Sequence, residues 1–548
     1  MTTDDSTSNS DIRQIARDAV GHAADSTNAM WTTVNAEEVL TGTMTPVTWS
    51  FHLGSEQGFR AGYVALGMLP RRELTSPKDA DQKFLSSMYR KSVLNIDRMR
   101  DMADATPGSS GEALEEAMFG RVRPGIGGPR RSRYPIVAVK APLAIRRARR
   151  DLRSMAAGLR GSRKQAIRDL SIPAPSATLA KTLLAAARDA YDDVIPLHFL
   201  VTVALQGEYA KIVAMAASSR VPELTMSLVQ SPGGVDELRM LRDLWEVSRD
   251  RLTLEQFLDE HGYHGPNEAN VEANVWREDP TPVRHLVDRY RGLADDAGPE
   301  AIFDKRTHEQ AVAVEQLLAP MNRRQRAKAR RVLASAGELV ELRELGKSLF
   351  LQCIDAGRAA VKTLGRQLAA DGLIDSETDV VYLTVDELLA EAKNFTDLVS
   401  QRKIEQELFA RIDIPTYFEG VPAPAIRPSV PTQSRTSPGD SPDTVTGQGV
   451  SPGIAEGRPR IVTDPGDLDF DDGDILVCRT TDPSWASLIM VAGALVVDVG
   501  GAMSHAAIVA RELGIPCVIN TAIGTRDLSG LTRVRVDGTS GEVAVLDR

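Results

Sequence analysis

Residues 496–520 read VVDVGGAMSHAAIVARELGIPCVIN. The apolar run at the start predicts a buried strand, and the paired Gly500 and Gly501 predict a tight turn after it. A helix is expected to begin near Ser504 and to end at Gly514, because a polar cap and a glycine are typical of the two ends of a helix. This strand–turn–helix order indicates an α/β domain at the C-terminal end.

His505 falls in the first turn of the expected helix. Unpaired backbone N–H groups and the positive end of the helix dipole favour a phosphate there, and an imidazole at that place can attack phosphorus. Arg511, nearly two turns on, either adds charge to a phosphoryl group or anchors the helix. A His505 that only caps or packs is the alternative, and the Gly500–Gly501 context favours the phosphate site.

Short apolar runs separated by Gly, Asp and Pro surround this stretch. Strands are predicted at 458–462, 473–478, 493–500, 516–520, 533–538 and 541–546, with helices at 485–493 and 504–514. Alternation of strands and helices over about 100 residues is typical of a compact α/β domain, which we place at 448–548.

The larger N-terminal part is mainly helical in its pattern, and we expect one α-helical domain over 27–420. Apolar residues recur at spacings of three and four in 177–217 and in 337–372, and the second stretch ends at a glycine suited to a helix C-terminus. Residues 379–389, DVVYLTVDELL, predict a short strand and then a helix capped by Thr384.

Two segments lack the composition of a packed core. Residues 1–26 are rich in Ser, Thr and Asp, and we expect a flexible tail. Residues 421–447 hold six prolines and no aromatic residue, which predicts a flexible linker between the two domains.

The length, composition and net charge of the chain exclude several classes of protein. With 548 residues, 42% of them hydrophobic, the chain can form several cores, and its net charge of −10 argues against a dedicated nucleic-acid binder. Cys353, Cys478 and Cys517 are too scattered for a disulfide framework or a zinc site, so no metal is predicted. No secretory signal and no apolar run of about 20 residues is visible, so we expect a cytoplasmic protein without a membrane span.

Two basic blocks stand out against this acidic background. Residues 121–168 contain fifteen Lys and Arg against the single acid Asp151, and the second block is RRQRAKARR at 323–331. Few aromatic side chains lie between the charges, which gives base stacking little support. RNA binding, docking of an acidic partner and a solvated helix face stay open, and the solvated face is favoured.

The C-terminal motifs resemble a known domain. The segments 500–518, 480–501 and 448–462 are similar to the phosphohistidine swivelling domain of the PEP-utilising enzymes, which include phosphoenolpyruvate synthase, pyruvate phosphate dikinase and rifampin (rifampicin) phosphotransferase. The resemblance implies that His505 accepts a phosphoryl group, with Gly500, Gly501, Ser504 and Arg511 around it. It also implies that the whole domain swings between two active sites.

The helical region resembles the substrate domain of rifampin phosphotransferase-like proteins. TGTMTPVTWSF at 41–51, EHGYHGPNEANVEANVWREDP at 260–280 and VELRELGKSLF at 340–350 carry the likeness. His264 and Asn270 depart from the pattern, which has Arg and Asp at those two positions. The resemblance implies a domain that binds the acceptor of the phosphoryl group.

Arg343 and Lys347 are four residues apart on one helical face, so both can converge on one anion and neutralise phosphoryl oxygens. A solvated face paired with Glu341 and Glu344 is an equally good interpretation.

His264 and Glu268 lie in a Gly- and Pro-rich loop. We expect them to be the best acid and base candidates for an acceptor hydroxyl, although ordinary loop hydrogen bonding explains such residues more often.

These observations predict a phosphotransferase that passes a phosphoryl group from His505 to a hydroxyl of a small organic molecule. No Gly-rich nucleotide loop is visible in the first 400 residues, and no substrate barrel follows the His505 domain. We therefore expect ATP and Mg²⁺ to be bound by a separate ATP-grasp subunit, as in phenylphosphate synthase-like systems, and no cofactor to be bound tightly here. The alternatives are a non-catalytic regulatory or binding relative and an antibiotic-modifying phosphotransferase.

Overall fold

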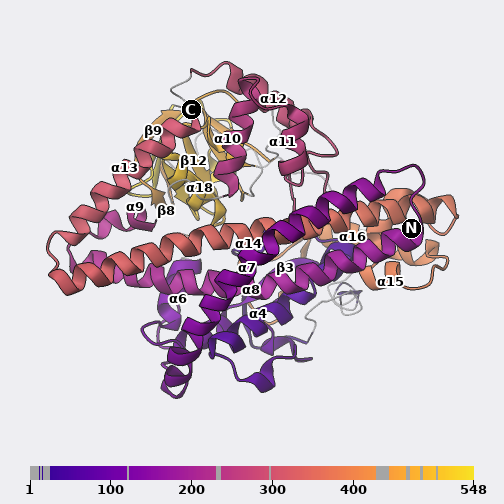
Figure 1. The fold of residues 1–548 in the computed structure, drawn as a ribbon, viewed down its shortest axis with the longest axis horizontal. Helices are drawn as coiled ribbons and strands as arrows, with labels where there is room; N and C mark the ends of the chain where they lie inside the picture. Colours follow the sequence, from indigo (N-terminus) through magenta and orange to yellow (C-terminus); the bar gives the residue numbers. More distant parts are fainter. Residues whose placement is uncertain are drawn as a thin grey trace.

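The computed structural model describes two parts, a large helical one and a smaller C-terminal one built on sheets (Figure 1). The described residues are 12, 15, 16, 25–119, 122–229, 236–294, 298–426, 444–463, 470–481, 485–501 and 504–547. The layout agrees with the predicted mainly helical domain followed by an α/β domain.

Three long helices form the frame of the helical part: α7 (Tyr134–Leu170), α8 (Ala177–Ser218) and α14 (Arg323–Ala370). Figure 1 shows α14 crossing the middle of the molecule, and α14 packs along both α8 and α7. On α14, Leu342, Leu349 and Ala356 are buried at intervals of seven residues, which places them on one face.

The two long helices predicted by periodicity are present. Helix α8 matches the predicted 177–217 almost to the residue, and its cap Ser176 accepts a hydrogen bond from the Leu179 N–H. Helix α14 begins earlier than predicted, because Asn322 and Gln325 form a capping box, so the block 323–331 becomes its first turns. The predicted glycine terminator is Gly372, which follows the cap with φ of +69°.

Shorter elements cover this frame. The remaining helices are α2 (Ala36–Val39), α3 (Pro46–Phe51), α4 (Gly54–Leu66), α5 (Ile96–Asp104), α6 (Gly111–Phe119), α9 (Thr225–Val229), α10 (Asp236–Ser248), α11 (Leu254–His261), α12 (Thr281–Arg291), α13 (Pro299–Leu318), α15 (Val385–Leu389) and α16 (Thr396–Ala410). Short 3₁₀ turns lie at Arg71–Glu73, Ala80–Gln82, Arg131–Arg133, Pro222–Leu224 and Glu377–Tyr382.

The helical part also contains strands that the sequence interpretation missed. Strands β1 (Met30–Thr32), β2 (Leu85–Met88), β3 (Lys91–Asn95) and β5 (Tyr417–Glu419) form one sheet in the order β2-β3-β1-β5. Strand β4 (Ile412–Asp413) pairs with β6 (Ala425–Ile426). Each is too short to give a clear alternating pattern.

One predicted strand is wrong. The start of DVVYLTVDELL forms the 3₁₀ turn Glu377–Tyr382, where Val380 is buried against α14. The turn packs so closely that a Cβ on Gly365 would lie 2.4 Å from the Glu377 carbonyl oxygen. The predicted cap Thr384 is correct, since it forms a capping box with Glu387 at the start of α15.

The C-terminal part holds two sheets. Strands β10 (Pro459–Ile461), β11 (Ile475–Cys478), β12 (Ala494–Val497) and β13 (Cys517–Ile519) run parallel, with β8 (Gln448–Ser451) antiparallel at the edge. Strands β7 (Thr444–Thr446), β15 (Glu542–Asp547), β14 (Arg533–Asp537) and β9 (Ile454–Gly457) form an antiparallel sheet. The helices are α17 (Ala486–Ile489), α18 (His505–Leu513) and α19 (Gly524–Asp527).

The six strands and two helices predicted for this part are all present. Most are shorter than predicted, β12 and α17 by about half, and β15 ends one residue later. Strands β7, β8 and β9 and helix α19 were missed. Strand β7 pairs with β15, so residues 444–446, which we assigned to the linker, belong to the C-terminal sheets. Of the predicted linker, residues 427–443 lie outside the described residues.

Most of the predicted tail 1–26 also lies outside the described residues. Ile12 and Ala16 are buried in a cluster with Phe409, and Ser26 accepts a hydrogen bond from the Trp31 indole N–H at 2.8 Å. The described part of the tail is therefore packed against the helical part rather than solvated.

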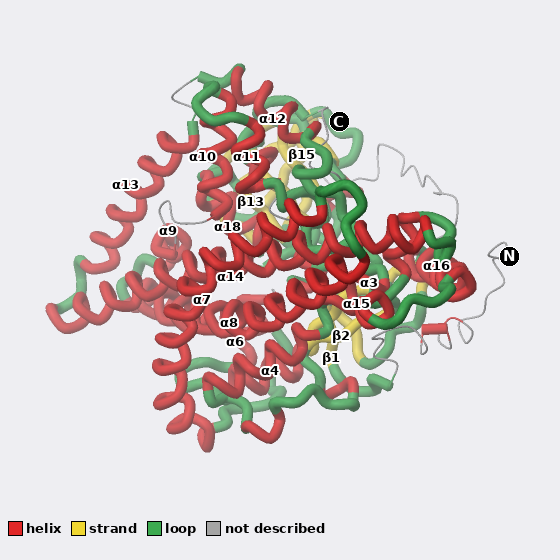
Figure 2. Tube along the Cα trace, turned by 45° about the vertical axis from the view of Figure 1, so that its right-hand side comes forward, coloured by secondary structure: helices red, strands yellow, loops and turns green. Residues whose placement is uncertain are grey.

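The C-terminal part is docked on the helical part. In Figures 1 and 2 it lies above α14, beside α10 and α13. Helix α18 packs against α13, Arg289 donates to the Phe470 carbonyl, and Arg479 pairs with Glu37 at 3.1 Å. Apolar side chains of the two parts form one continuous buried cluster.

Helix α8 is long and apolar enough to cross a membrane by length and composition alone. Its buried residues Ala180, Leu184, Ala187, Tyr191 and Val194 instead follow a core-facing helical spacing, and α8 packs on α4, α7 and α14. This arrangement is that of a core helix.

Candidate functional site

His505 is the first residue of α18, as predicted. Ser504 caps the helix by accepting the Ala507 N–H, and the Ser504 N–H donates to the Gly501 carbonyl at 2.9 Å. The imidazole is 8% exposed, and its Nδ1 lies 3.0 Å from the Thr481 hydroxyl oxygen. Thr481 therefore fixes the ring orientation, and Nε2 is the ring nitrogen not bonded to it.

The electrostatic surroundings keep this imidazole neutral. Burial, followed by the positive charges of Lys347, Arg343 and His264, holds the pKa of His505 well below its usual value of 6.5. A neutral ring keeps a lone pair on one nitrogen, which is what a nucleophile toward phosphorus requires.

A cavity of about 70 Å³ lies beside His505, between the two parts of the molecule. Arg343 and Lys347 from α14 line it, as does Glu268 from the loop before α12. The structure therefore brings together four of the predicted site residues, which are separated by up to 237 positions in the chain (505 − 268).

Arg343 and Lys347 line the cavity as the first alternative expected, and of the second alternative only the pairing with Glu344 is seen, on a buried rather than a solvated face. They lie one turn apart on α14. Their charge lowers the pKa of the neighbouring His198 to about 3, after the larger effect of burial. His198 donates from Nδ1 to the Arg343 carbonyl oxygen at 3.2 Å, so it is a neutral wall of the cavity.

His264 and Glu268 form a buried pair next to this cavity. The His264 Nδ1 and the Glu268 Oε2 are 2.7 Å apart, and each of the two residues is 3% exposed. Glu268 lines the cavity itself, and His264 contributes to the electrostatics of His505. The pair is thus placed for acid and base chemistry as well as for structural hydrogen bonding.

The loop that carries this pair has little freedom. Gly265 has φ of +154°, and a Cβ there would lie 3.0 Å from the Asn274 carbonyl oxygen. The Arg358 guanidinium, fully buried on α14, donates to the carbonyl oxygens of Glu268 at 2.6 Å and Asn270 at 3.1 Å. The Glu268 loop is therefore fixed to the same helix that supplies Arg343 and Lys347.

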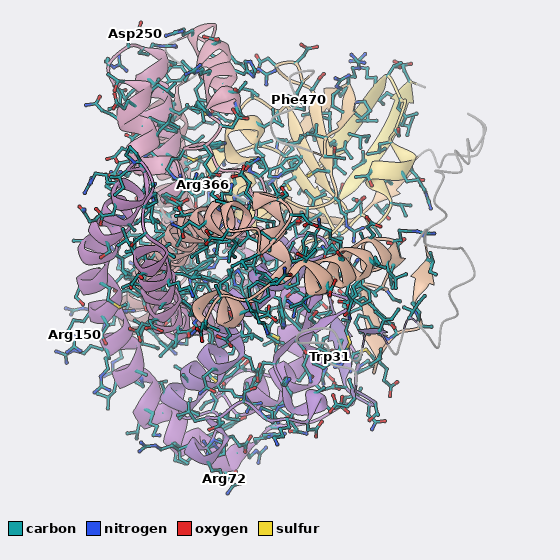
Figure 3. The ribbon with its side chains drawn as sticks, turned by 90° about the vertical axis from the view of Figure 1, so that its right-hand side faces the viewer. Trp31, Arg72, Arg150, Asp250, Arg366 and Phe470 are labelled. Carbon is teal, nitrogen blue, oxygen red and sulfur yellow. The ribbon has the colours of Figure 1, made fainter. Side chains whose placement is uncertain are left out.

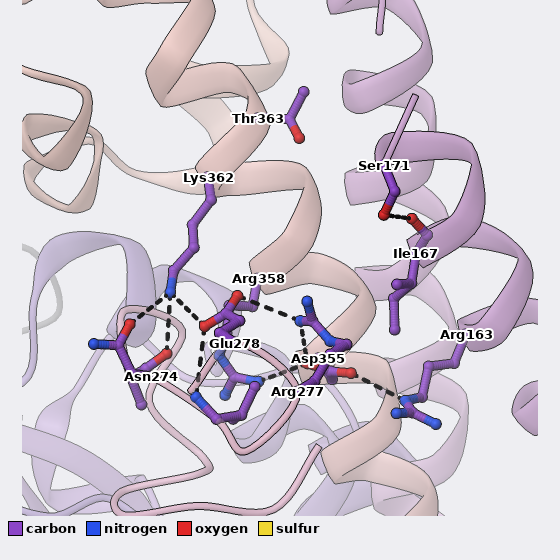
Figure 4. A network of polar contacts seen from close by, with 12 residues as sticks. Arg163, Ile167, Ser171, Asn274, Arg277, Glu278, Asp355, Arg358, Lys362 and Thr363 are labelled. Atoms are coloured by element: carbon purple, nitrogen blue, oxygen red, sulfur yellow. Dashed lines mark hydrogen bonds and ion pairs between the residues drawn. The ribbon is translucent and has the colours of Figure 1, made fainter. Parts of the chain in front are cut away.

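Asp355 anchors that arrangement, as Figure 4 shows. Its fully buried carboxylate pairs with Arg163 at 3.0 Å, Arg277 at 2.8 Å and Arg358 at 3.0 Å. Despite the opposing effect of burial, the three guanidinium groups hold the pKa of Asp355 far below its usual value. Arg163 belongs to the basic block 121–168, so one member of that block serves the core rather than a solvated face.

Other predicted site residues occupy different places. Arg511 is buried on α18, outside the lining of the His505 cavity, with Tyr209 of α8 and Glu512 as electrostatic neighbours. Gly500 and Gly501 precede the helix, and residues 502–503 between them and Ser504 are not described. In the described part of the chain, no group of three His, Cys, Asp or Glu side chains is arranged to hold a metal.

Thr481 and His198 are among the site residues that sequence reasoning missed, as are Thr41 and Asn267 in the cavity lining. Thr481 belongs to the segment 480–501 whose likeness to the swivelling domain was noted, so that resemblance was the signal that could have found it. His198 sits within the long apolar pattern of α8, where nothing in the local sequence distinguishes it from a core residue.

Comparison with known proteins agrees with this geometry. Residues 470–541 match the mobile domain of PEP-utilising enzymes, and residues 251–344 match the fourth domain of rifampicin phosphotransferase. The chain is therefore similar to PEP-utilising enzymes in its C-terminal part and to rifampicin phosphotransferase in a segment of its helical part. The mobile-domain match contains His505, and the fourth-domain match contains the Glu268 loop and Arg343.

Curated relatives extend the similarity. Rifampicin phosphotransferase of Streptomyces sviceus is 29% identical over 332 residues, which cover 58% of this chain and 37% of the relative. Rifampicin phosphotransferase of Bacillus subtilis is 27% identical over 311 residues, covering 54% and 35%. An uncharacterised protein of Mycobacterium tuberculosis is 32% identical over 287 residues, covering 52% and 30%. The matched region thus spans about a third of each relative's length.

Proposed function

We propose that this protein is a phosphotransferase of the PEP-utilising enzyme family, in which His505 carries a phosphoryl group to a hydroxyl of a small organic acceptor. One observation supports this most strongly. The neutral imidazole on the mobile domain and the cations Arg343 and Lys347 on the helical part face one shared cavity. Two cations beside a nucleophilic nitrogen suit a phosphoryl group in transfer.

The transfer step follows from the placement of these groups. The acceptor oxygen attacks the phosphorus, so a P–O bond forms while the bond from phosphorus to Nε2 of His505 breaks. The electron pair of the broken bond returns to Nε2, and Glu268 takes the hydroxyl proton, with His264 orienting its carboxylate. Arg343 and Lys347 balance the charge on the phosphoryl oxygens throughout.

The phosphoryl donor in this proposal is ATP, bound with Mg²⁺ by an ATP-grasp partner. That partner transfers the β-phosphoryl group to His505 while water takes the γ-phosphoryl group, so AMP and phosphate are released. The donor site and the acceptor cavity are then far apart, so the mobile domain travels between them. In this proposal, the docked arrangement is the stage at which His505 faces the acceptor. The whole cycle takes place in the cytoplasm.

The size of the cavity favours a small acceptor. Pockets for drug-sized ligands measure roughly 300–1,000 Å³, whereas the space beside His505 is about 70 Å³. The names of the relatives support an antibiotic-modifying phosphotransferase as the second candidate. A bulky scaffold would require the docked parts to move apart.

Labelling with [β-³²P]ATP tests the proposal, with an extract of the native cells supplying the ATP-binding partner. Label is expected on this chain in a form stable to base and lost in acid, and His505→Ala and His505→Asn should both remove it. Arg343→Ala and Lys347→Ala should keep the label and slow its transfer to the acceptor. Label on His505→Ala would place the nucleophile elsewhere.

A further inference from the structure

A second cavity of about 530 Å³ lies on the other side of the Asp355 cluster. The end of α7, the connection 171–175 and the C-terminal half of α14 surround it. Lys347 lines the first cavity and Lys362 the second, and the 15 residues between them correspond to roughly 22 Å of helix. The volume of this second cavity falls within the usual range for small-molecule sites.

The elements around this cavity differ in character. The end of α7 and the connection after it contribute the apolar side chains Ile167, Leu170, Ile172 and Pro175. Ile172 is 52% exposed, although it is a large apolar side chain at the cavity wall. Helix α14 and the loop before α12 contribute the polar side chains Arg277, Glu278, Lys362, Thr363, Arg366 and Gln367, together with Ala359 and Ala370 of α14.

The polar side chains have an excess of positive charge. Their one carboxylate, Glu278, is already paired with Lys362 at 2.6 Å and with Arg277 at 3.4 Å. Arg366 donates to the Thr363 hydroxyl at 3.0 Å and forms no ion pair with a described residue. Asp355 nearby is shared by three guanidinium groups (Figure 4), so it offers no further carboxylate to Arg366.

We propose that this cavity binds an amphiphilic organic acid. The carboxylate of the ligand pairs with Arg366 beside Arg277, because a guanidinium fork fits a carboxylate and both residues line the cavity. The hydrocarbon part of the ligand lies along Ile167, Leu170 and Ile172 and removes their surface from water. This site is separate from the His505 cavity and does not depend on the proposed function.

Isothermal titration of the full chain with octanoate tests the site. Saturable binding is expected, with acetate and octanol both much weaker, because acetate lacks the apolar body and octanol lacks the charge. Arg366→Glu should weaken octanoate binding at least tenfold, since losing a charged hydrogen bond and adding repulsion costs about 1.4 kcal/mol or more. Ala370→Trp, at an exposed position of the cavity wall, should block binding by filling space.

Two controls locate the bound ligand. Arg150→Glu makes the same charge change on α7, where Arg150 is highly exposed and pairs with its neighbour Asp151, and octanoate affinity should not change (Figure 3). Arg343→Ala alters only the His505 cavity and should also leave the affinity unchanged. The proposal is wrong if octanoate shows no saturable binding, if Arg343→Ala abolishes binding while Arg366→Glu does not, or if acetate binds as tightly as octanoate.

Discussion

Thr481 holds the imidazole of His505 through a single hydrogen bond to Nδ1. Thr481→Val removes that bond while keeping the shape of the side chain, so the ring loses its fixed orientation. We expect phosphorylation of His505 to slow roughly fivefold, because one hydrogen bond contributes about 1 kcal/mol. The initial rate of labelling from [β-³²P]ATP measures this effect. Thr481→Ser keeps the hydroxyl and should label at close to the normal rate; an equal loss in both variants would contradict the assigned role.

In the proposed reaction, Glu268 acts in the transfer step rather than in the loading of His505. Glu268→Gln keeps the size and the contact with His264 but cannot take a proton. Labelling should be unchanged, while transfer from the labelled chain to the acceptor falls roughly a hundredfold. A single-turnover chase of the labelled chain separates the two steps. Slow labelling with normal transfer would show that Glu268 acts on the other half of the reaction.

At the scale of elements, the Asp355 cluster joins α7, α14 and the Glu268 loop. Asp355→Asn leaves three buried guanidinium groups without their shared carboxylate, and we expect a loss of about 3–5 kcal/mol in the free energy of unfolding. Urea unfolding followed by circular dichroism measures it. Asp386→Asn is the matched control, because Asp386 is 79% exposed and pairs with Arg188 at the surface, where less than about 1 kcal/mol is expected. Equal losses would contradict the anchoring role.

Most ends of α8 and α14 could be predicted from sequence, whereas several short elements could not. Periodicity places α8, and Gly372 marks the end of α14, but the start of α14 at the Asn322 capping box was missed because the block 323–331 was not assigned to the helix. Residues 379–382 look like a strand because Val380, Val381 and Tyr382 are apolar, but packing against Gly365 selects a 3₁₀ turn. The strand propensity of three consecutive residues is outweighed here by the tertiary packing against α14.

The residues of the candidate site could be predicted one by one, but their arrangement around one cavity could not. His505, Arg343, Lys347 and Glu268 each carry a local signal, either a helix start, a spacing of four or a distinctive loop. Their meeting in one cavity depends on the docking of two parts of the chain, which no local pattern encodes. Their proposed roles in phosphoryl transfer stay predictions until the labelling experiments are done.

At the scale of the whole molecule, the proposed cycle depends on the connection between the two parts. Residues 427–443 lie between strand β6, which pairs with β4, and strand β7, which pairs with β15. Deleting them should leave both parts folded but abolish net transfer, because His505 could no longer reach the ATP-grasp partner. Circular dichroism and labelling measure the two outcomes. A Gly/Ser segment of equal length should restore transfer, and full turnover by the deletion variant would contradict the swivelling proposal.

Three buried neutral histidines make global stability depend on pH. The pKa is lowered to about 4 for His52 and to about 3 for His198, and lies well below 6.5 for His505, with burial as the largest cause. Below pH 6.5 the unfolded chain binds protons that the native state does not, so stability falls as pH decreases, by at most about 1.4 kcal/mol per pH unit for each histidine.

Urea unfolding at pH 7.5, 6 and 5 checks this dependence. The raised pKa of Glu56 acts in the opposite direction, so the decisive measurement is the difference between the native chain and His52→Gln. The variant should lose less stability between pH 6.5 and pH 5, because one titrating group is gone. Parallel curves for the two proteins would contradict a neutral, buried His52.

The continuous apolar cluster between the two parts has a thermal consequence. Whenever α18 leaves the helical part, apolar side chains on both surfaces enter water, and their hydration raises the heat capacity of the undocked state. Such association weakens on cooling, because the hydrophobic driving force declines at low temperature. In the proposed cycle, cooling is therefore expected to lower the fraction of time that His505 occupies the acceptor cavity. Delivery of the phosphoryl group would then slow even where the chemistry itself is unchanged.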